Sequence, residues 1–258
     1  MSAPFYAEVV GVTRLSPHFV RITFGGAAMP DFVPVGHDQW FRLFLPHPGE
    51  DKPNLPDFTD DTGLRTWYNS TPESQRPIIR NYTVRRFHPE TSTMDVDFVV
   101  HGDTGPATSW AQRVEIGDIV GLYDEGTMFT VRPDTAWLLF VGDETGLPAI
   151  AAVTETLSGS VPFRSFLEIP LAADRQELPG DGIAHWRYRE TPGDQPELLD
   201  LLRDTDFPPG RVQALLVGES SLVCGARRHL VRDRGVDKDR IKFCGYWRHP
   251  ATPDEDVD

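Results

Sequence analysis

Residues 80–87, RNYTVRRF, contain three arginines and two aromatic residues. In a strand, side chains two positions apart lie on one face, so Arg80 and Tyr82 would point the same way, with Thr83 at the neighbouring position. A guanidinium beside an aromatic ring suits a ligand that carries both a phosphate and a flat, electron-poor ring system. The alternative is a basic strand whose arginines form ion pairs with surrounding acidic side chains, and the octapeptide by itself favours that alternative.

A second segment that could bind an anion is residues 101–110, HGDTGPATSW. Its small residues mark a point where a strand runs into a helix. Backbone N–H groups at such a junction, with the hydroxyls of Thr108 and Ser109, would form a site for a pyrophosphate; the alternative is an ordinary capped turn. His101 is the one histidine of eight in such a cluster, and a single histidine is more often structural than catalytic.

Acidic residues follow an apolar run in residues 141–150, VGDETGLPAI. Asp143 and Glu144 would lie at the carboxyl end of a parallel strand, where open α/β sheets bind ligands. Acids at a strand end are also common solvated turn residues. The sequence has no G-x-G-x-x-G, H-E-x-x-H or C-x-x-C pattern, so it carries no standard dinucleotide or metal fingerprint.

Charge and composition limit the class of protein. The chain has 258 residues, with 39 acidic and 25 basic side chains and a formal net charge of −14, which argues against a nucleic-acid partner. No apolar run approaches the length of a membrane span, and the first ten residues lack the pattern of a secretory signal. Two cysteines, Cys224 and Cys244, define no disulfide framework. We therefore expect a soluble, cytoplasmic protein with reduced cysteines.

The first half of the chain is typical of β structure. Short segments rich in Val, Phe, Ile and Thr are separated by Gly and Pro, and residues 105–114 are typical of a short helix. Residues 46–77 are polar and rich in proline and predict a long irregular excursion. In residues 93–101 the alternation of Asp95 and Asp97 with apolar residues predicts a half-buried strand. Six or so such strands predict a small closed barrel.

From about residue 134 the pattern changes to strands that alternate with helices. Residues 136–143 form an almost continuous apolar run, which is typical of a strand buried on both faces of a parallel sheet. The pattern predicts an open α/β sheet, with a last helix over 220–235 capped by Ser220 or Ser221. We expect two domains, residues 1–133 and 134–258, and a frayed acidic tail at 253–258.

Taken in order and spacing, these segments resemble the siderophore-interacting proteins, which are FAD-dependent ferric-siderophore reductases related to the ferredoxin–NADP reductases. The resemblance covers residues 5–249 and rests on RNYTVR, DVDFVVHGDTGPATSWA, GDETGLPAI, VGES and the terminal GYWR. The sequence departs from the family at Gly146, where alanine is usual, and at His249, where glycine commonly follows the GYWR arginine. The resemblance implies a six-stranded antiparallel FAD-binding β-barrel followed by an α/β domain with a mostly parallel sheet.

The resemblance also implies roles for individual residues. Tyr82 would lie against the isoalloxazine ring, Thr83 near its N5 atom, and Arg80 at the pyrophosphate. The other predicted cofactor contacts are Asp97, Val99 and His101 along the ring and ribityl chain, Ala107, Thr108 and Ser109 at the phosphates, and Asp143 and Thr145 near the adenine and nicotinamide ends.

By the same resemblance, electrons pass from NAD(P)H or reduced ferredoxin through FAD to a ferric siderophore. No side chain is expected to act as a catalytic acid, base or nucleophile, or as a metal ligand. Lys52, Lys242 and Arg248 are the candidates for a basic rim that binds an anionic siderophore. We expect a monomer. A general flavin reductase, or a protein that binds flavin and siderophore without turnover, are the alternatives.

Overall fold

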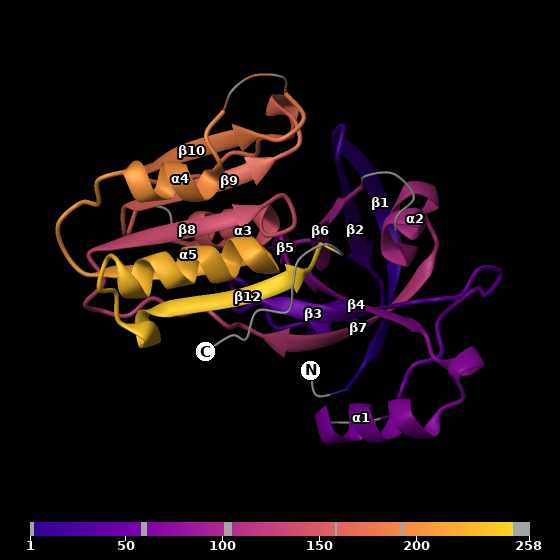
Figure 1. The fold of residues 1–258 in the computed structure, drawn as a ribbon. Coiled ribbons are helices and arrows are strands. Elements are labelled where there is room, and N and C mark those ends of the chain that lie inside the picture. Colours follow the sequence, from indigo (N-terminus) through magenta and orange to yellow (C-terminus); the bar gives the residue numbers. More distant parts are fainter. Residues whose placement is uncertain are drawn as a thin grey trace. The chain divides into compact units, whose positions relative to one another are not determined.

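The chain folds into two compact units, Met1–Thr127 and Met128–Asp258, in the computed structural model (Figure 1). The structure describes residues 3–57, 61–100, 105–157, 159–191, 193 and 195–249. His101 and the acidic tail at 253–258 lie outside the described residues. The domain boundary expected between residues 133 and 134 stays a prediction.

The first unit is built on one antiparallel sheet of seven strands in the order β4-β3-β7-β1-β2-β6-β5. The predicted fold class is confirmed, with seven strands in place of six because residues 86–88 form a short strand of their own. Tyr82 on β4 packs against Phe98 on β6, so the sheet curls until strands from its two sides meet. The elements are β1 Phe5–Ser16, β2 Phe19–Gly25, β3 Trp40–Leu45, β4 Ile78–Thr83, β5 Arg86–His88, β6 Thr93–Val99, β7 Ile119–Gly126, α1 Asp61–Ser70, α2 Pro106–Arg113 and the 3₁₀ turns Met29–Asp31 and Glu73–Gln75.

Strand β6 is buried on both faces, which corrects the expectation of a half-buried strand. Val96 and Phe98 lie in the barrel core, as predicted. On the opposite face Asp95 and Asp97 are also buried, because Arg21 of β2 covers them and forms an ion pair with each. Polar and apolar side chains do alternate along β6, as predicted. The polar face of the strand is covered by basic side chains of neighbouring strands and not by water.

The excursion over residues 46–77 is not wholly irregular, since it contains α1. Leu64 and Trp67 of this helix pack with Phe44 of β3 and Tyr123 of β7 in a small second cluster. The helix was missed because the many prolines of the segment lie outside residues 61–70.

The second unit is built on a parallel sheet of five strands in the order β10-β9-β8-β11-β12. Trp137, Leu139 and Val141 of β8 join a core with α4 and α5. The alternate side chains face the other side of the sheet, where α3 lies (Figure 1), so the prediction of a strand buried on both faces is confirmed. The elements are β8 Trp137–Asp143, β9 Phe163–Ile169, β10 Gly182–Tyr188, β11 Val212–Glu219, β12 Ile241–Trp247, α3 Leu147–Thr156, α4 Leu198–Asp204, α5 Ser220–Arg232 and the 3₁₀ turns Ala172–Asp174 and Lys238–Arg240.

Two further features bear on the class of protein. Within the described residues, none of the helices is long and apolar enough to span a bilayer. Cys224 and Cys244 are partly buried and are not joined by a disulfide.

Candidate functional site

Strand β4 presents Arg80 and Tyr82 on one face, as predicted. Tyr82 belongs to the barrel side of the strand, and its ring lies 4.2 Å, between centroids, from the buried ring of Phe98. Burial raises the pKa of the Tyr82 hydroxyl, and the charge of Arg80 opposes that shift only in part. The Tyr82 hydroxyl is thus protonated and uncharged, and the Tyr82 ring packs on the buried ring of Phe98. Phe98 was not among the residues predicted for the site, although its alternation had placed it in the core.

Arg80 is exposed and not neutralised by a carboxylate. Its Nη1 donates a hydrogen bond to the carbonyl oxygen of Ile79 at 2.7 Å. Within the part of the chain that the structure describes, no acidic side chain forms an ion pair with it. The next residue of the predicted set, Thr83, is buried at the end of the same strand. Arg80 therefore keeps most of its donors available for an anion.

Helix α2 packs against β4 and β6 and carries the predicted phosphate contacts. Its N-cap is Gly105, and no side chain of the described residues caps it. The first intrahelical hydrogen bond runs from Ser109 N to Gly105 O at 2.9 Å, so the N–H groups of Ala107 and Thr108 precede it and can bind an anion. The Thr108 hydroxyl faces the carbonyl oxygen of Val99 at 3.5 Å. A Cβ at Gly105 would meet no atom within 4 Å, which leaves room at this helix end.

The structure gives the carboxylate of Asp97 a partner that the sequence did not suggest. Arg21 binds it with two hydrogen bonds, 2.7 Å from Nε and 3.0 Å from Nη2, and Arg85 lies 3.7 Å away. Arg85 is itself buried, so this arginine is not a surface charge. The role of Asp97 along the flavin path stays a prediction.

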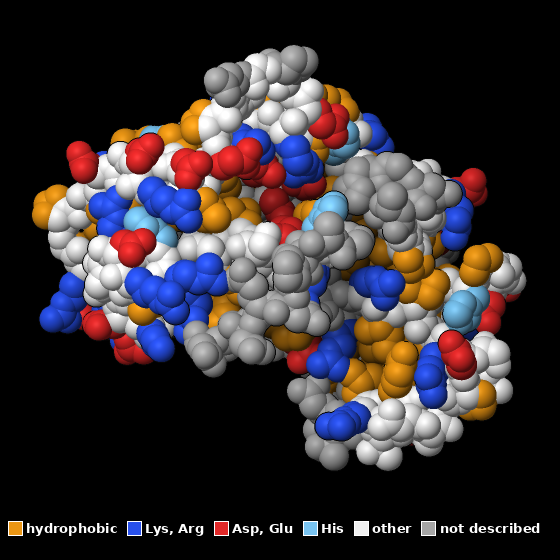
Figure 2. Space-filling view, in the orientation of Figure 1, with side chains coloured by type: hydrophobic (Ala, Val, Ile, Leu, Met, Phe, Trp, Pro, Cys, Tyr) orange, Lys and Arg blue, Asp and Glu red, His pale blue; other side chains and the backbone are white. Residues whose placement is uncertain are grey.

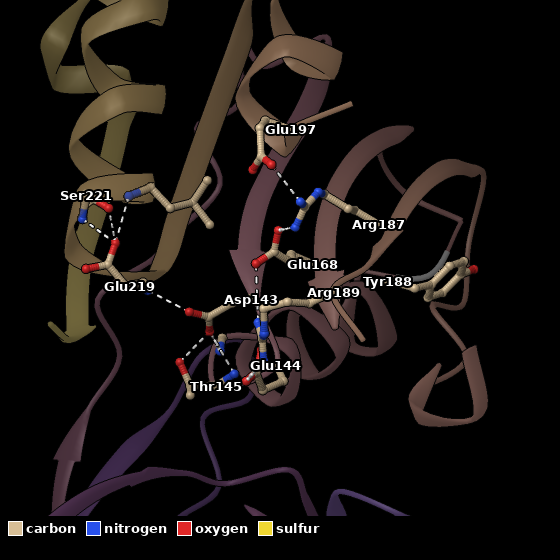
Figure 3. Close-up of polar contacts among 12 residues, drawn as sticks. Asp143, Glu144, Thr145, Glu168, Arg187, Tyr188, Arg189, Glu197, Glu219 and Ser221 are labelled. Atoms are coloured by element: carbon tan, nitrogen blue, oxygen red, sulfur yellow. Dashed lines mark hydrogen bonds and ion pairs between the residues drawn. The ribbon is translucent and has the colours of Figure 1, made fainter. Parts of the chain in front are cut away.

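In the second unit, the side chains of interest gather where the parallel strands end. Figure 3 shows the side chains at four strand ends: Asp143 at the end of β8 with Glu144 after it, Glu168 on β9, Arg187, Tyr188 and Arg189 at the end of β10, and Glu219 at the end of β11. Figure 2 shows acidic and basic side chains side by side over this carboxyl edge. The predicted position of Asp143 and Glu144 at a carboxyl edge is confirmed.

Asp143 is buried and anchors three elements. Its carboxylate accepts hydrogen bonds from the N–H (2.8 Å) and hydroxyl (2.5 Å) of Thr145, from the N–H of Glu219 (2.7 Å), and from Nε1 of Trp247 (2.8 Å). A Cβ at Gly218, where φ is +139°, would lie 2.8 Å from this carboxylate. Both oxygens of the carboxylate thus accept hydrogen bonds from groups of the protein itself. The predicted contact of Asp143 with a nucleotide stays a prediction.

The departure from the family at Gly146 has a local cause. A Cβ at this position would lie 2.5 Å from the carbonyl oxygen of Val217 on β11 and 2.8 Å from the Val217 side chain. Alanine therefore does not fit at this position in this chain.

Helix α5 is capped by an acid and not by the predicted serines. The carboxylate of Glu219 accepts hydrogen bonds from the N–H groups of Ser221 (2.6 Å) and Leu222 (3.1 Å), and also from the Ser221 hydroxyl. The N-terminus of α5 is consequently occupied by a negative charge of the chain itself, which disfavours a phosphate there.

Five charged side chains of alternating sign form a row along the edge, which we call the ion-pair ladder: Glu144, Arg189, Glu168, Arg187 and Glu197. Arg189 lies 2.5 Å from Glu144 and 3.2 Å from Glu168; Arg187 pairs with Glu168 and, at 2.7 Å, with Glu197. Burial raises the pKa of the Glu144 carboxyl, and the hydrogen bond from Arg189 opposes this shift. Because each arginine of the ladder pairs with two carboxylates, the charges of both arginines are already neutralised.

The predicted siderophore contacts are divided between the two units. The Lys52 ammonium lies 5.0 Å from the centroid of the Tyr6 ring, and the Tyr6 hydroxyl donates to the carbonyl oxygen of Pro53 at 3.2 Å, which holds this part of the excursion on β1. Lys242 on β12 and Arg248 after it are exposed. Among the described residues, no group of three His, Cys, Asp or Glu side chains could hold a metal ion.

The donor set of the first unit fits FAD. Strand β4 presents an exposed guanidinium and, on the same face, an aromatic ring that packs on Phe98; the uncapped N-terminus of α2 lies beside them. These groups match a ligand with a pyrophosphate and a flat ring. A ferredoxin–NADP reductase from Neisseria gonorrhoeae shares the fold: it is 13% identical with a TM-score of 0.65, over 96% of this chain and all of that one. The likeness shows the fold, and the donor set fits a protein that binds a flavin nucleotide.

Comparison with known proteins narrows this class to a family. Residues 8–128 match the siderophore-interacting FAD-binding domain and residues 135–250 the siderophore-interacting protein domain. The chain belongs to the siderophore-interacting protein family, as the sequence motifs predicted.

Three relatives illustrate the range of the family. A siderophore utilization protein from T. fusca is 32% identical, with a TM-score of 0.82 over 96% of this chain and 94% of its own. Ferric vibriobactin reductase ViuB of Vibrio cholerae is 26% identical over 95% of this chain and 89% of its own. The NADPH-dependent ferric-chelate reductase of Escherichia coli is 28% identical over 93% of this chain and 91% of its own.

Proposed function

We propose that this protein is an FAD-dependent ferric-siderophore reductase, which passes electrons from NAD(P)H or reduced ferredoxin through FAD to an Fe(III)-siderophore and so releases Fe(II). The observation that carries the proposal is the set of flavin-compatible groups in the first unit: Arg80 and Tyr82 on one face of β4, beside the uncapped N-terminus of α2. Membership of the family, and the names of the Vibrio cholerae and Escherichia coli relatives, support it.

Reduction of the iron by one electron is a chemically suitable way to release it from a siderophore. Siderophores hold iron through hard oxygen ligands, which favour Fe(III) over Fe(II), so the transfer of one electron weakens the complex. Bound FAD would supply the conversion of a two-electron donor into single electrons. The protein then needs to bind and orient its ligands, and no side chain has to act as an acid, base or nucleophile.

We assign the flavin contacts as follows. Arg80 binds the pyrophosphate, Tyr82 supports the ring with Phe98 behind it, and Thr83 lies near N5. The N–H groups at the start of α2 bind the phosphates. The wider proposed set, Asp97, Val99, His101, Ala107, Thr108, Ser109, Asp143 and Thr145, follows from the family resemblance.

We further propose that Lys52, Lys242 and Arg248 bind the anionic siderophore. The net charge of −14 repels such a substrate, but exposed charges are screened beyond about 8 Å at physiological salt. Local basic side chains therefore matter more than the total charge. A cytoplasmic location and a monomeric state are part of the same proposal.

The proposal is tested by identifying the chromophore and the electron acceptors. We expect FAD in the supernatant of the denatured protein and bleaching of the bound flavin by NADH, NADPH or reduced ferredoxin. We also expect that the rate of reoxidation depends on which ferric siderophore is supplied, with ferricyanide and free flavin as the reference acceptors. Folded protein that neither holds nor takes up FAD would overturn the proposal. Equal rates with all acceptors would favour a general flavin reductase, and absence of bleaching by every donor would favour a binding protein.

Replacing Arg80 by alanine is expected to weaken FAD binding about 10- to 150-fold, because hydrogen bonds to charged groups contribute about 1.5–3 kcal/mol. Equilibrium titration of the apoprotein with FAD measures the change. Arg86→Ala is the matched control, since Arg86 is an exposed arginine of the same segment and should leave FAD affinity unchanged. Unaltered FAD affinity in Arg80→Ala would show that Arg80 is a structural strand residue.

A further inference from the structure

Two motifs of the sequence, VGES at residues 217–220 and GYWR at residues 245–248, meet at the carboxyl edge of the second unit. The first motif ends β11 and begins α5, and the second lies at the end of β12. The two strands pair in parallel, with Gly218 opposite Gly245 and Glu219 opposite Trp247. The register of the sheet therefore brings the two motifs side by side.

Two consecutive residues of the first motif, Glu219 and Ser220, hold the peptide groups on both sides of Arg248. The Ser220 hydroxyl donates a hydrogen bond to the carbonyl oxygen of Trp247 at 2.9 Å. The Oε1 atom of Glu219 accepts a hydrogen bond from the N–H of His249 at 3.2 Å. Because a peptide group is planar, these bonds fix the plane before Arg248 and the plane after it. They therefore also fix the direction in which the Arg248 side chain leaves the backbone.

The carboxylate of Glu219 serves two elements at once. Its Oε2 atom accepts hydrogen bonds from the N–H groups of Ser221 and Leu222 at the start of α5 (Figure 3), while Oε1 binds His249. The helix thus fixes the carboxylate, and the carboxylate fixes the chain after Arg248. An aspartate at position 219 would also cap the helix, but its side chain is one methylene shorter and would not reach both partners.

The residues before Arg248 are suited to the same arrangement. A Cβ at Gly245 would lie 2.5 Å from the hydroxyl oxygen of Ser220, so a larger residue there would push the hydroxyl away from the Trp247 carbonyl. The Trp247 side chain is held as well, since its Nε1 donates a hydrogen bond to the Asp143 carboxylate at 2.8 Å. The chain that leads to Arg248 is therefore anchored through both its backbone and a side chain.

A fixed backbone matters for an exposed arginine that binds an anion. Arg248 is exposed, and the ordering of a long, flexible side chain and of its backbone opposes binding. When the backbone is already ordered, less entropy is lost as the ligand binds. The guanidinium is also limited to the positions that its own side-chain rotamers allow.

We propose that Glu219 and Ser220 are positioning residues for siderophore binding, because they hold the backbone on both sides of Arg248 and so direct its guanidinium toward the anionic ferric complex. The inference rests on the proposed function for the role of Arg248. Neither Glu219 nor Ser220 has to touch the siderophore.

Binding of gallium(III) siderophores to the FAD-loaded, full-length protein tests the proposal without turnover, since gallium(III) has the charge of iron(III) but is not reduced by a flavin. The wild type and its variants are titrated with an anionic tris-catecholate complex and with a neutral tris-hydroxamate complex. Glu219→Asp and Ser220→Ala should each weaken the anionic complex about 2- to 12-fold, the effect of one hydrogen bond. The double variant should weaken it about 5- to 30-fold, the effect of ordering the backbone of one residue. The neutral complex should bind as it does to the wild type.

Arg248→Ala distinguishes positioning from any other role of Glu219 and Ser220. If both residues act through Arg248, their substitution in an Arg248→Ala protein should cause no further loss, because coupled residues are not additive. Asp200→Ala is the matched control, since Asp200 is an exposed acid of the same unit that pairs with Arg203 on α4, and it should bind both complexes as the wild type does. Unchanged affinity in the double variant, equal losses for the two complexes, or a further loss in the Arg248→Ala protein would overturn the proposal.

The outcomes also separate this proposal from the proposed function. A protein that reduces ferric siderophores, but whose affinity for the anionic gallium(III) complex does not depend on Arg248, would retain its function and lose the positioning residues. A protein that binds this complex through Arg248 and depends on Glu219 and Ser220 to do so, but reduces no ferric siderophore, would do the reverse.

Discussion

Asp97→Ala is expected to lower the free energy of unfolding by about 3–5 kcal/mol, the usual cost of removing one partner from a buried ion pair. The Asp97 side chain is fully buried, and its carboxylate binds Arg21 twice and lies near Arg85. Alanine would leave the charge of Arg85, which is 8% exposed, without this carboxylate. Urea unfolding of the apoprotein measures the loss.

The control for Asp97 is Glu90→Ala. Glu90 lies 3.8 Å from His88 but is 70% exposed, so its removal should change stability by less than about 1 kcal/mol. Asp97→Asn separates the structural role from the predicted flavin contact. A large loss of FAD affinity in Asp97→Asn with unchanged stability of the apoprotein would mean that the carboxylate serves the flavin after all.

Asp143→Ala should destabilise the second unit by at least about 3 kcal/mol. Three donors of partly buried hydrogen bonds would lose their acceptor, and each loss costs about 1 kcal/mol or more. The donors come from the start of α3, the end of β11 and Trp247 of β12. We therefore expect faster amide hydrogen exchange in β12, together with lower stability in urea.

Asp200→Ala is the control for Asp143, because Asp200 is an exposed acid of the same unit whose partner Arg203 is exposed too. Its effect should stay within about 1 kcal/mol. If Asp143→Ala were as stable as this control and had lost affinity for nucleotides, the predicted cofactor contact would be right and the anchoring role wrong.

Asp97 and Asp143 show that a residue of a family motif can have a structural role where a cofactor contact was predicted. Both belong to segments that identify the family, and both were predicted to contact the cofactor. In the structure, each side chain is buried and bound to partners within its own unit.

The sequence by itself determined the types of element and the family. Turn residues and β-branched runs predicted the antiparallel sheet, and the apolar run at residues 136–143 predicted a strand buried on both faces. Alternation placed Arg80 and Tyr82 on one face of β4. These features depend on neighbours in the chain, and local patterns record them directly.

Only the tertiary structure decided which charges are neutralised. Arg21 and Asp97 are 76 positions apart, and Trp247 and Asp143 are 104 apart. Arg175 keeps its donors because Trp186 and Tyr188, and no acid among the described residues, lie beside it. Arg21 and Arg175 carry the same charge, and what each of them binds depends on the side chains that the fold places beside it. No local pattern carries that information, because register and strand order are set by the packing of the whole unit.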